Sequence, residues 1–161
     1  MPSQRQRIYW DADVWLSYIS GEAERLPTLD ALLADSSSEK GNIEIYTSVI
    51  SEVEVAFAKS EQEKKALDPN TERLIDELWA DRDALKLVEY HEGIGKEARS
   101  IIRLGIERGW SLKPLDAIHI ATAKRSQIIE FHTYDKRLLK YSNDVGFPIV
   151  EPHIIQPRML P

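Results

Sequence analysis

Three aspartates occupy positions from which carboxylates commonly reach a ligand. Asp11 directly follows a short apolar, aromatic run that is typical of a buried strand, and Asp135 follows a second such run. Asp116 is the second residue of the segment 115–123, which is apolar almost all round and therefore predicts a buried helix. Because ligands gather beyond the carboxyl ends of parallel strands, we expect these three side chains to converge.

Converging carboxylates repel one another unless a cation neutralises them. Oxygen-only ligands suit Mg²⁺ or Mn²⁺, and the chain contains no cysteine, which excludes thiolate metal sites and disulfides. Each aspartate taken alone is also explained by capping or by the first turn of a helix. The pattern therefore leaves two interpretations open, a metal centre or three helix caps.

A fourth carboxylate is expected from the segment 49–58, which we predict to be one helix. Its inward stripe is formed by Ile50, Val53 and Phe57. At about 100° per residue, Glu54 lies beside this stripe, whereas Glu52 lies on the opposite side. Glu54 is therefore the expected internal ligand and Glu52 a solvated charge.

The elements that must position these carboxylates alternate between strands and helices. Strands are expected at 7–10, 43–47, 85–89, 128–133 and 147–150, and helices at 14–19, 23–34, 49–58, from 69, 94–108, 114–126 and 136–141. This order, without hairpin signals, predicts a single α/β domain over residues 1–150, with a mainly parallel sheet flanked by helices on both faces. Residues 151–161 contain three prolines and are expected to form an extended tail.

The charge of the chain is unevenly distributed. The formal net charge is −6 over 161 residues, which argues against a plain electrostatic nucleic-acid binder. Residues 93–143 reverse this balance, with ten basic and five acidic side chains. Five basic residues of this block are candidate contacts to phosphates, with a merely solvated face as the alternative: Lys96, Arg99, Arg103, Lys113 and Arg137.

No apolar stretch approaches the length of a membrane span, and acidic residues interrupt the N-terminal apolar run where a signal peptide would need continuity. We therefore expect a soluble, cytoplasmic protein without a membrane partner.

Four segments resemble, in order, the motifs of PIN-domain nucleases. They are 8–14 (IYWDADV), 47–55 (TSVISEVEV), 115–123 (LDAIHIATA) and 133–138 (TYDKRL). The resemblance implies a metal-dependent endoribonuclease that hydrolyses RNA phosphodiester bonds, most like the toxins of prokaryotic toxin–antitoxin pairs. It assigns catalysis and Mg²⁺ or Mn²⁺ binding to Asp11, Glu54, Asp116 and Asp135.

The resemblance also bears on neighbouring residues and on partners. Asp13 stands where the family often has asparagine or another small polar residue, so its role stays open, and Thr133 is a candidate for a supporting hydrogen bond. An RNA substrate, a protein antitoxin and a homodimer are implied. The helices at 14–19 and 23–34 could receive an antitoxin segment as a helix in a groove.

Two other interpretations remain. The segment Asp11–Asp13 resembles the nucleophile motif of aspartyl-phosphate phosphatases, in which Asp11 would attack phosphorus and Asp13 would act as the acid. A non-catalytic interaction module, with its aspartates serving only as caps, is the third interpretation. The four histidines show no metal-ligand spacing along the chain, and His119 is expected to be a packed helix residue.

Overall fold

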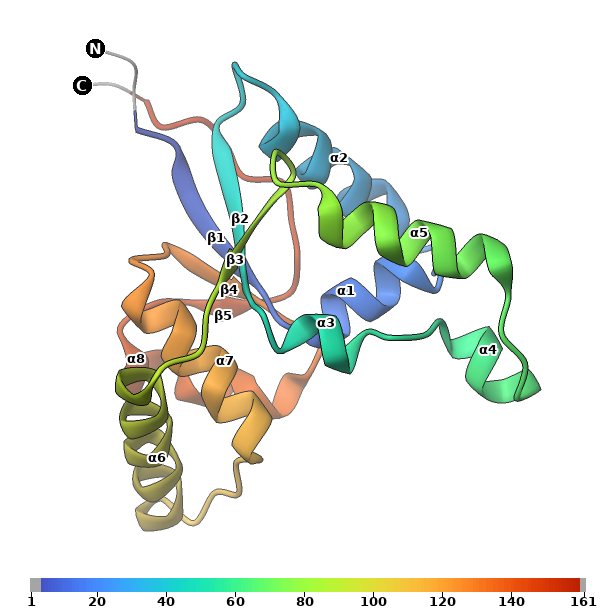
Figure 1. Ribbon diagram of the computed structural model, residues 1–161. Coiled ribbons are helices and arrows are strands. Elements are labelled where there is room, and N and C mark those ends of the chain that lie inside the picture. Colours follow the sequence, from blue (N-terminus) through green and yellow to red (C-terminus); the bar gives the residue numbers. More distant parts are fainter. Residues whose placement is uncertain (1–3, 160–161) are drawn as a thin grey trace.

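The computed structural model describes residues 4–159. Over this range a five-stranded sheet has the order β3-β2-β1-β4-β5, and all neighbouring strands are parallel. The strands are β1 (Gln6–Trp10), β2 (Ile43–Ser48), β3 (Leu85–Val88), β4 (Glu130–His132) and β5 (Ile149–Val150) (Figure 1). The predicted α/β fold with a parallel central sheet is confirmed.

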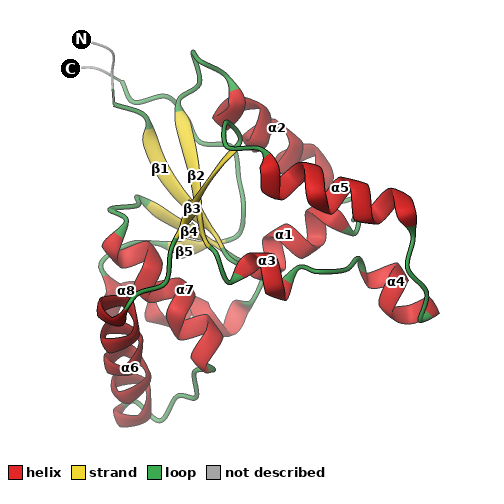
Figure 2. Ribbon diagram, in the orientation of Figure 1, coloured by secondary structure: helices red, strands yellow, loops and turns green. Residues whose placement is uncertain are grey.

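Helices cover both faces of this sheet (Figure 2). One face carries α1 (Ala12–Ile19), α2 (Leu26–Ser37) and α5 (Pro69–Ala80), and the other carries α6 (Glu92–Glu107) and α7 (Pro114–Arg125). The shorter elements are α3 (Ser51–Glu54), α4 (Lys59–Lys64), the 3₁₀ helix η1 (Lys136–Tyr141) and α8 (Ser142–Val145). Among the described residues, no helix combines the length and the apolar character that crossing a bilayer requires.

Alternation along β1 divides the core between the two faces. Ile8 and Trp10 are fully buried on the side of α1, α2 and α5, whereas Tyr9 is fully buried on the side of α6 and α7. Successive side chains of a strand point to opposite faces, and a parallel sheet is normally covered on both. The carboxyl ends of the strands therefore remain as the edge from which loops and helix starts can reach a common space.

The segment 49–58 is not the single helix that its spacing predicts. The helix α3 ends at Glu54, and Val55 leaves helical geometry at φ −112° and ψ 57°. Val53, predicted to face inward, is 79% exposed, whereas Val55 and Ala58 are buried in the core beside α1 and α5. Burying these two residues requires the chain to leave the helix after one turn, so the predicted stripe is wrong.

The chain after β5 returns along the sheet. Residues 151–159 form neither helix nor strand. Their course is held by Gln6, whose Nε2 donates to the carbonyl of Gln156 over 3.1 Å, and by Ile155, which packs against the core. This segment therefore lies against β1 and β4, on the same face of the sheet as Trp10.

Candidate active site

The junction between β1 and α1 presents Asp11 to the carboxyl edge of the sheet. Asp11 is the N-cap of α1 and accepts a hydrogen bond from the backbone N–H of Val14 over 3.4 Å. Only 4% of this residue is exposed. Burial raises the pKa of Asp11 well above its ordinary value, and the neighbouring Asp13 raises it further. The fold thus holds a desolvated carboxylate beside a second one, an arrangement that favours a cation.

A cleft of about 570 Å³ opens at this edge and is lined by all four predicted carboxylates. They come from four parts of the chain: Asp11 from the end of β1, Glu54 from α3, Asp116 from α7 and Asp135 from the start of η1. The structure therefore brings together residues that are separated by up to 124 positions in the sequence.

Asp116 reaches the cleft because α7 begins there. Pro114 occupies the first turn of α7, where its missing N–H costs nothing, and Asp116 follows within the same turn. Burial raises the pKa of Asp116, and the charges of Asp135 and Glu54 raise it further. The aspartate is thus a helix-start residue and also part of a crowded acidic group.

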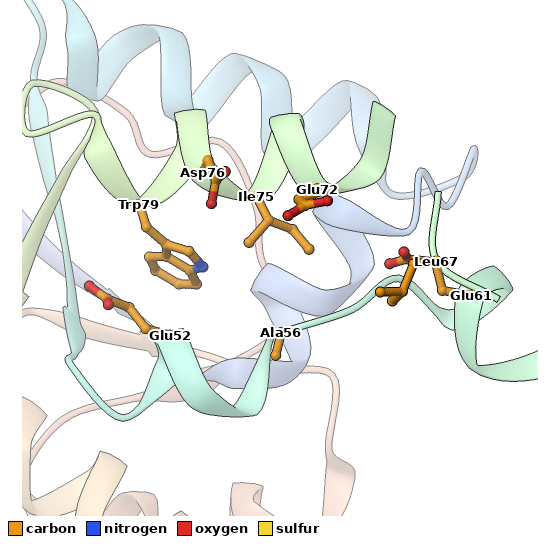
Figure 3. A pocket seen from close by; sticks show the side chains of 8 residues that line it. All are labelled: Glu52, Ala56, Glu61, Leu67, Glu72, Ile75, Asp76 and Trp79. Atoms are coloured by element: carbon orange, nitrogen blue, oxygen red, sulfur yellow. The ribbon is translucent and has the colours of Figure 1, made fainter. Parts of the chain in front are cut away.

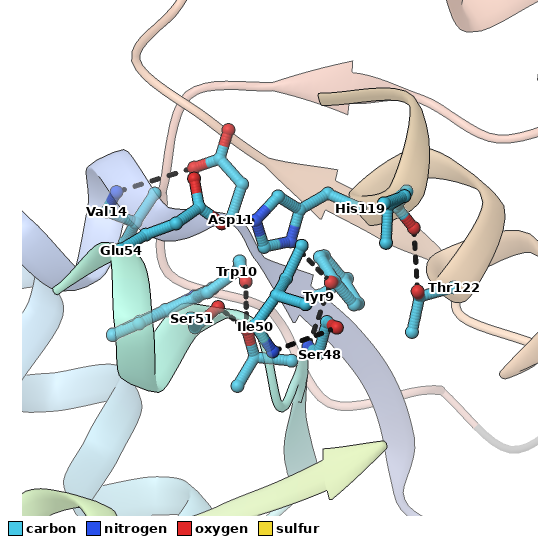
Figure 4. Close-up of polar contacts among 12 residues, drawn as sticks. Tyr9, Trp10, Asp11, Val14, Ser48, Ile50, Ser51, Glu54, His119 and Thr122 are labelled. Carbon is cyan, nitrogen blue, oxygen red and sulfur yellow. Dashed lines mark hydrogen bonds and ion pairs between the residues drawn. The ribbon is translucent and has the colours of Figure 1, made fainter. Parts of the chain in front are cut away.

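A buried hydrogen-bond chain orients Glu54 (Figure 4). The backbone N–H of Ser48 donates to the Tyr9 hydroxyl over 2.9 Å, that hydroxyl lies 2.7 Å from Nδ1 of His119, and Nε2 of His119 lies 2.6 Å from Oε1 of Glu54. Burial raises the pKa of Tyr9 well above its ordinary value. The neutral phenol therefore donates to Nδ1, which leaves the proton of His119 on Nε2 to be donated to Glu54.

His119 is the residue whose part in the site was missed at the sequence level, where it was expected only to pack within its helix. His119 is 1% exposed and does pack within the core: its ring lies edge-on to the ring of Tyr9, with 5.8 Å between the two ring centres. Its two polar partners lie 110 and 65 positions away. No spacing near His119 could have shown them, although a polar side chain on a helix that is otherwise apolar requires a partner.

Asp135 forms an ion pair with the guanidinium group of Arg137. Its carboxylate accepts two side-chain hydrogen bonds from Arg137, over 2.9 Å and 2.7 Å, and one from the Arg137 backbone N–H over 3.0 Å. This bonding lowers the pKa of Asp135. Arg137 therefore neutralises part of the cleft, and a metal at Asp135 would use the oxygen lone pairs that remain.

Asp13 is held by the turn that follows β4. Its carboxylate accepts hydrogen bonds from the Thr133 hydroxyl over 3.1 Å and from the backbone N–H of Tyr134 over 3.2 Å. The Thr133 hydroxyl in turn accepts from the backbone N–H of Asp135 over 3.0 Å. This arrangement fixes α1 against the turn that carries Asp135, and it uses Asp13 as an acceptor, which gives no support to the phosphatase role of a proton donor.

The five basic residues proposed as phosphate contacts separate into two groups. Lys113 and Arg137 line the carboxylate cleft. Arg99 and Arg103 line a different groove between α6 and α7, and Lys96 forms an ion pair with Glu92 over 3.2 Å. The structure thus places two of the five beside the acidic group and leaves the α6 residues outside the cleft.

Glu52 and Glu54 diverge although they share α3. Glu54 lines the cleft, whereas Glu52 is exposed and lines a separate pocket between α3 and α5. Figure 3 shows this pocket, with Trp79 and Ile75 facing it and carboxylates around it. The pair therefore offers a matched comparison, with one glutamate inside the carboxylate cleft and the other outside it.

The donor set of the cleft fits a hard divalent cation. Its charged ligands are all oxygens, and burial raises the pKa of both Asp11 and Asp116, so an added positive charge would relieve an unfavourable environment. The carboxylate oxygens are not drawn tightly together, since the set of three ligand atoms found within 4.8 Å of one another in the described chain lies elsewhere. Mg²⁺ retains several waters and uses few direct carboxylates, so it would not need all four as direct ligands.

The fold and the cleft together define an α/β domain with an acidic site at the carboxyl edge of a parallel sheet. The PIN domain family matches residues 8–143, and the chain belongs to this family. Comparison with curated protein sequences gives no match.

Solved structures show the same fold. VapBC2 from Rickettsia felis, bound to a DNA fragment from its promoter, aligns with a TM-score of 0.63 and 10% identity, covering 89% of this chain and 97% of that one. The sarcin–ricin loop cleaving toxin VapC20 of Mycobacterium tuberculosis aligns with a TM-score of 0.60 and 15% identity, covering 87% and 95%. A toxin–antitoxin complex from Klebsiella pneumoniae gives 0.59 and 18%, covering 92% and 99%. The structural neighbours are thus toxins of toxin–antitoxin pairs.

Proposed function

We propose that this PIN domain is a divalent-metal-dependent endoribonuclease that hydrolyses phosphodiester bonds of RNA. The observation that carries the proposal is the cleft in which Asp11, Glu54, Asp116 and Asp135 meet from four segments of the chain. Helix capping accounts for Asp11 and Asp135 individually. It does not account for Glu54, which caps no helix and is nevertheless held toward the same space by His119.

Asp11 and Asp116 are the residues proposed to bind Mg²⁺ or Mn²⁺ directly, with Glu54 and Asp135 binding directly or through water. When bound, the cation lowers the pKa of the attacking water and offsets the charge that develops on the phosphate. His119 keeps Glu54 aimed into the cleft, and Thr133 keeps Asp13 and the following turn in place.

Lys113 and Arg137 are proposed to hold the RNA backbone at the rim of the cleft, because a cationic side chain on an acidic edge attracts phosphate. A carboxylate of the cleft accepts the proton that water loses as its oxygen bonds to phosphorus; the bond from phosphorus to one sugar oxygen breaks, and that oxygen takes up a proton from solvent. Arg99 and Arg103 lie in the adjoining groove and would contact only a longer stretch of RNA.

The biological role proposed is that of a toxin held inactive in the cytoplasm by a protein antitoxin, and assembled as a homodimer. Toxin–antitoxin complexes among the structural neighbours support this role. The expected docking pair, α1 and α2, does not stand free, because Trp15 of α1 packs against Trp79 of α5 at 5.5 Å. An antitoxin helix would therefore meet α5 as well, along the groove between α2 and α5.

The test compares Glu54→Gln with Glu52→Gln in cleavage of purified bacterial RNA. The two glutamates lie on one turn of helix, but Glu54 alone lines the carboxylate cleft. We expect cleavage by the parent to require Mg²⁺ or Mn²⁺ and to stop in EDTA. Glu54→Gln should lower the rate at least about tenfold, as losses around metal ligands usually do, while Glu52→Gln keeps the parent rate.

RNA cleavage that continues in EDTA would contradict the proposed dependence on a divalent metal. Equal rates for the two variants would remove Glu54 from the site. A parent that binds Mn²⁺ in calorimetry yet cleaves no RNA would favour a binding module over an enzyme.

A further inference from the structure

A second cluster of ligand-type side chains lies on the face of β4, outside the cleft. Glu130 and His132 alternate along this short strand and therefore point to the same side of the sheet. His153 comes from the segment that returns along the sheet after β5. One ligand atom from each of the three lies within 4.8 Å of the other two. Two histidines without any metal spacing along the chain are thus brought together with a carboxylate in space.

Both imidazoles aim the same nitrogen at the same carboxylate. Nε2 of His132 lies 2.9 Å from Oε2 of Glu130, and Nε2 of His153 lies 2.8 Å from that same oxygen. The two rings are tilted at 43° with their centres 5.5 Å apart. Side chains that converge in this way need little rearrangement to surround an ion that takes the place of their shared hydrogen bonds.

The burial of the three residues is graded from the interior to the solvent. His132 is fully buried, Glu130 is partly exposed, and His153 is half exposed. An ion could therefore enter from the side of His153 and reach a ligand that is already positioned.

We propose that Glu130, His132 and His153 form a second metal site, which takes a borderline transition-metal ion such as Zn²⁺ and fastens the C-terminal segment to β4. Two imidazoles and one carboxylate are a ligand set of zinc and related ions, with one position left for water. Mg²⁺ and Mn²⁺ prefer oxygen ligands. The molecule therefore separates two kinds of cation between two places.

The expected affinity is moderate. A metal-bound histidine is usually supported by a partner at its other nitrogen, but Nδ1 of His132 is buried without a hydrogen-bond partner among the described residues. The site therefore lacks the outer support that strengthens permanent structural zinc centres. The fraction of molecules with a bound ion should therefore depend on the metal concentration. Residues 151–158 should be attached to the sheet more firmly when the ion is bound.

The experiment is calorimetric titration of the full chain with Zn²⁺ in the presence of excess Mg²⁺, which competes for the oxygen ligands proposed in the carboxylate cleft. The test variant is His153→Gln, because His153 is half exposed and glutamine retains a donor toward Glu130. The matched control is His91→Gln, which removes an exposed histidine outside the cluster. The parent should bind one Zn²⁺, His153→Gln should weaken binding more than about tenfold, and His91→Gln should bind as the parent does.

A second readout locates the ion. Zn²⁺ should slow amide hydrogen exchange in the segment 151–158 of the parent and leave that of His153→Gln unchanged. The variant Asp116→Asn separates this proposal from the nuclease, since it removes a cleft carboxylate and should keep Zn²⁺ binding. Equal Zn²⁺ affinity in the parent and in His153→Gln overturns the site, as does loss of binding in Asp116→Asn.

Discussion

The molecule gathers possible metal ligands in two different ways. The carboxylate cleft lies beyond the carboxyl ends of the strands, whereas the cluster of Glu130, His132 and His153 lies on the face of β4. The cleft collects oxygens from four segments beyond the strand ends, and Asp11, Glu54 and Asp135 are each hydrogen-bonded to a separate partner. The cluster draws three side chains into contact on the face of β4, where they already satisfy one another. The first arrangement raises the pKa of Asp11 and Asp116 through burial, whereas the hydrogen bonds of the second lower the pKa of Glu130.

This difference follows from where the ligands sit. Residues beyond the strand ends are free to be positioned by helix starts, and Asp11, Asp116 and Asp135 all lie at such starts. Within a strand, the alternation of side chains decides which face each residue occupies. Glu130 and His132 are two positions apart and therefore lie next to each other on the same face of β4. Loops and helix starts at the carboxyl edge of the sheet can adjust to a substrate. The fixed face of β4 is better suited to holding the C-terminal segment in place.

The largest effect is expected from Asp116→Asn. Asp116 is a proposed direct metal ligand, and asparagine keeps its shape but removes the charge, so RNA cleavage should fall at least about a hundredfold. The measurement is the initial rate of RNA cleavage in Mn²⁺. Zn²⁺ binding at the cluster should persist, which would show that the two regions act separately.

Asp76→Asn is the control for this change, because Asp76 is exposed on α5 and lies outside the cleft. It should cleave as the parent does. An Asp116→Asn protein that folds and retains the parent rate would contradict the assignment of the cleft.

A smaller effect is expected when the carboxylates remain and only their positioning is lost. His119→Leu removes the donor to Glu54 and leaves the Tyr9 hydroxyl without its acceptor. The rate should fall about ten- to a hundredfold with a weaker dependence on Mn²⁺, and the free energy of unfolding should fall by about 1–3 kcal/mol.

His119→Gln separates positioning from packing. Its terminal amide can donate to Glu54, so part of the Mn²⁺ affinity and of the rate should return. If His119→Leu lost stability but bound Mn²⁺ and cleaved RNA as the parent does, the histidine would have a packing role alone.

The cleft was more predictable from the sequence than the cluster, for a physical reason. The cleft aspartates follow strands or begin helices, so local patterns point to them one by one, and the sheet then brings their segments together. His132 and His153 are joined only by the returning chain after β5, whose course depends on contacts such as that between Gln6 and Gln156. No local pattern encodes such a return.

The errors at the sequence level have the same origin. The hydrophobic period over 49–58 predicts one helix with Val53 inward, but the helix ends at Glu54, Val55 is buried and Val53 is exposed. Glu54 nevertheless reaches the cleft, because one turn is enough to direct it. Arg99 and Arg103 share a helix face as their spacing indicates, but spacing does not reveal that this face borders a different groove.

The smallest effect is on stability, and it has opposite signs in the two regions. Burial raises the pKa of Asp116 in the folded protein above its ordinary value of 3.8. Between the unfolded and the folded pKa, the metal-free native state therefore binds more protons than the unfolded state. The free energy of unfolding falls as the pH rises through this range. Asp116→Asn should therefore be slightly more stable than the parent at neutral pH in EDTA. Partial exposure of Asp116 keeps this gain small.

The hydrogen bond from His132 lowers the pKa of Glu130 below 4.5. Its contribution to stability is therefore present above 4.5 and is lost as the pH falls through the lowered folded value, so Glu130→Gln should be less stable than the parent at neutral pH. Urea unfolding in EDTA, from about pH 7 down to about pH 3, should show the stability gain of Asp116→Asn and the stability loss of Glu130→Gln both becoming smaller as the pH falls. A neutral-pH loss of stability in Asp116→Asn would mean that its carboxylate is stabilised without a cation, and the contrast between the two regions would fail.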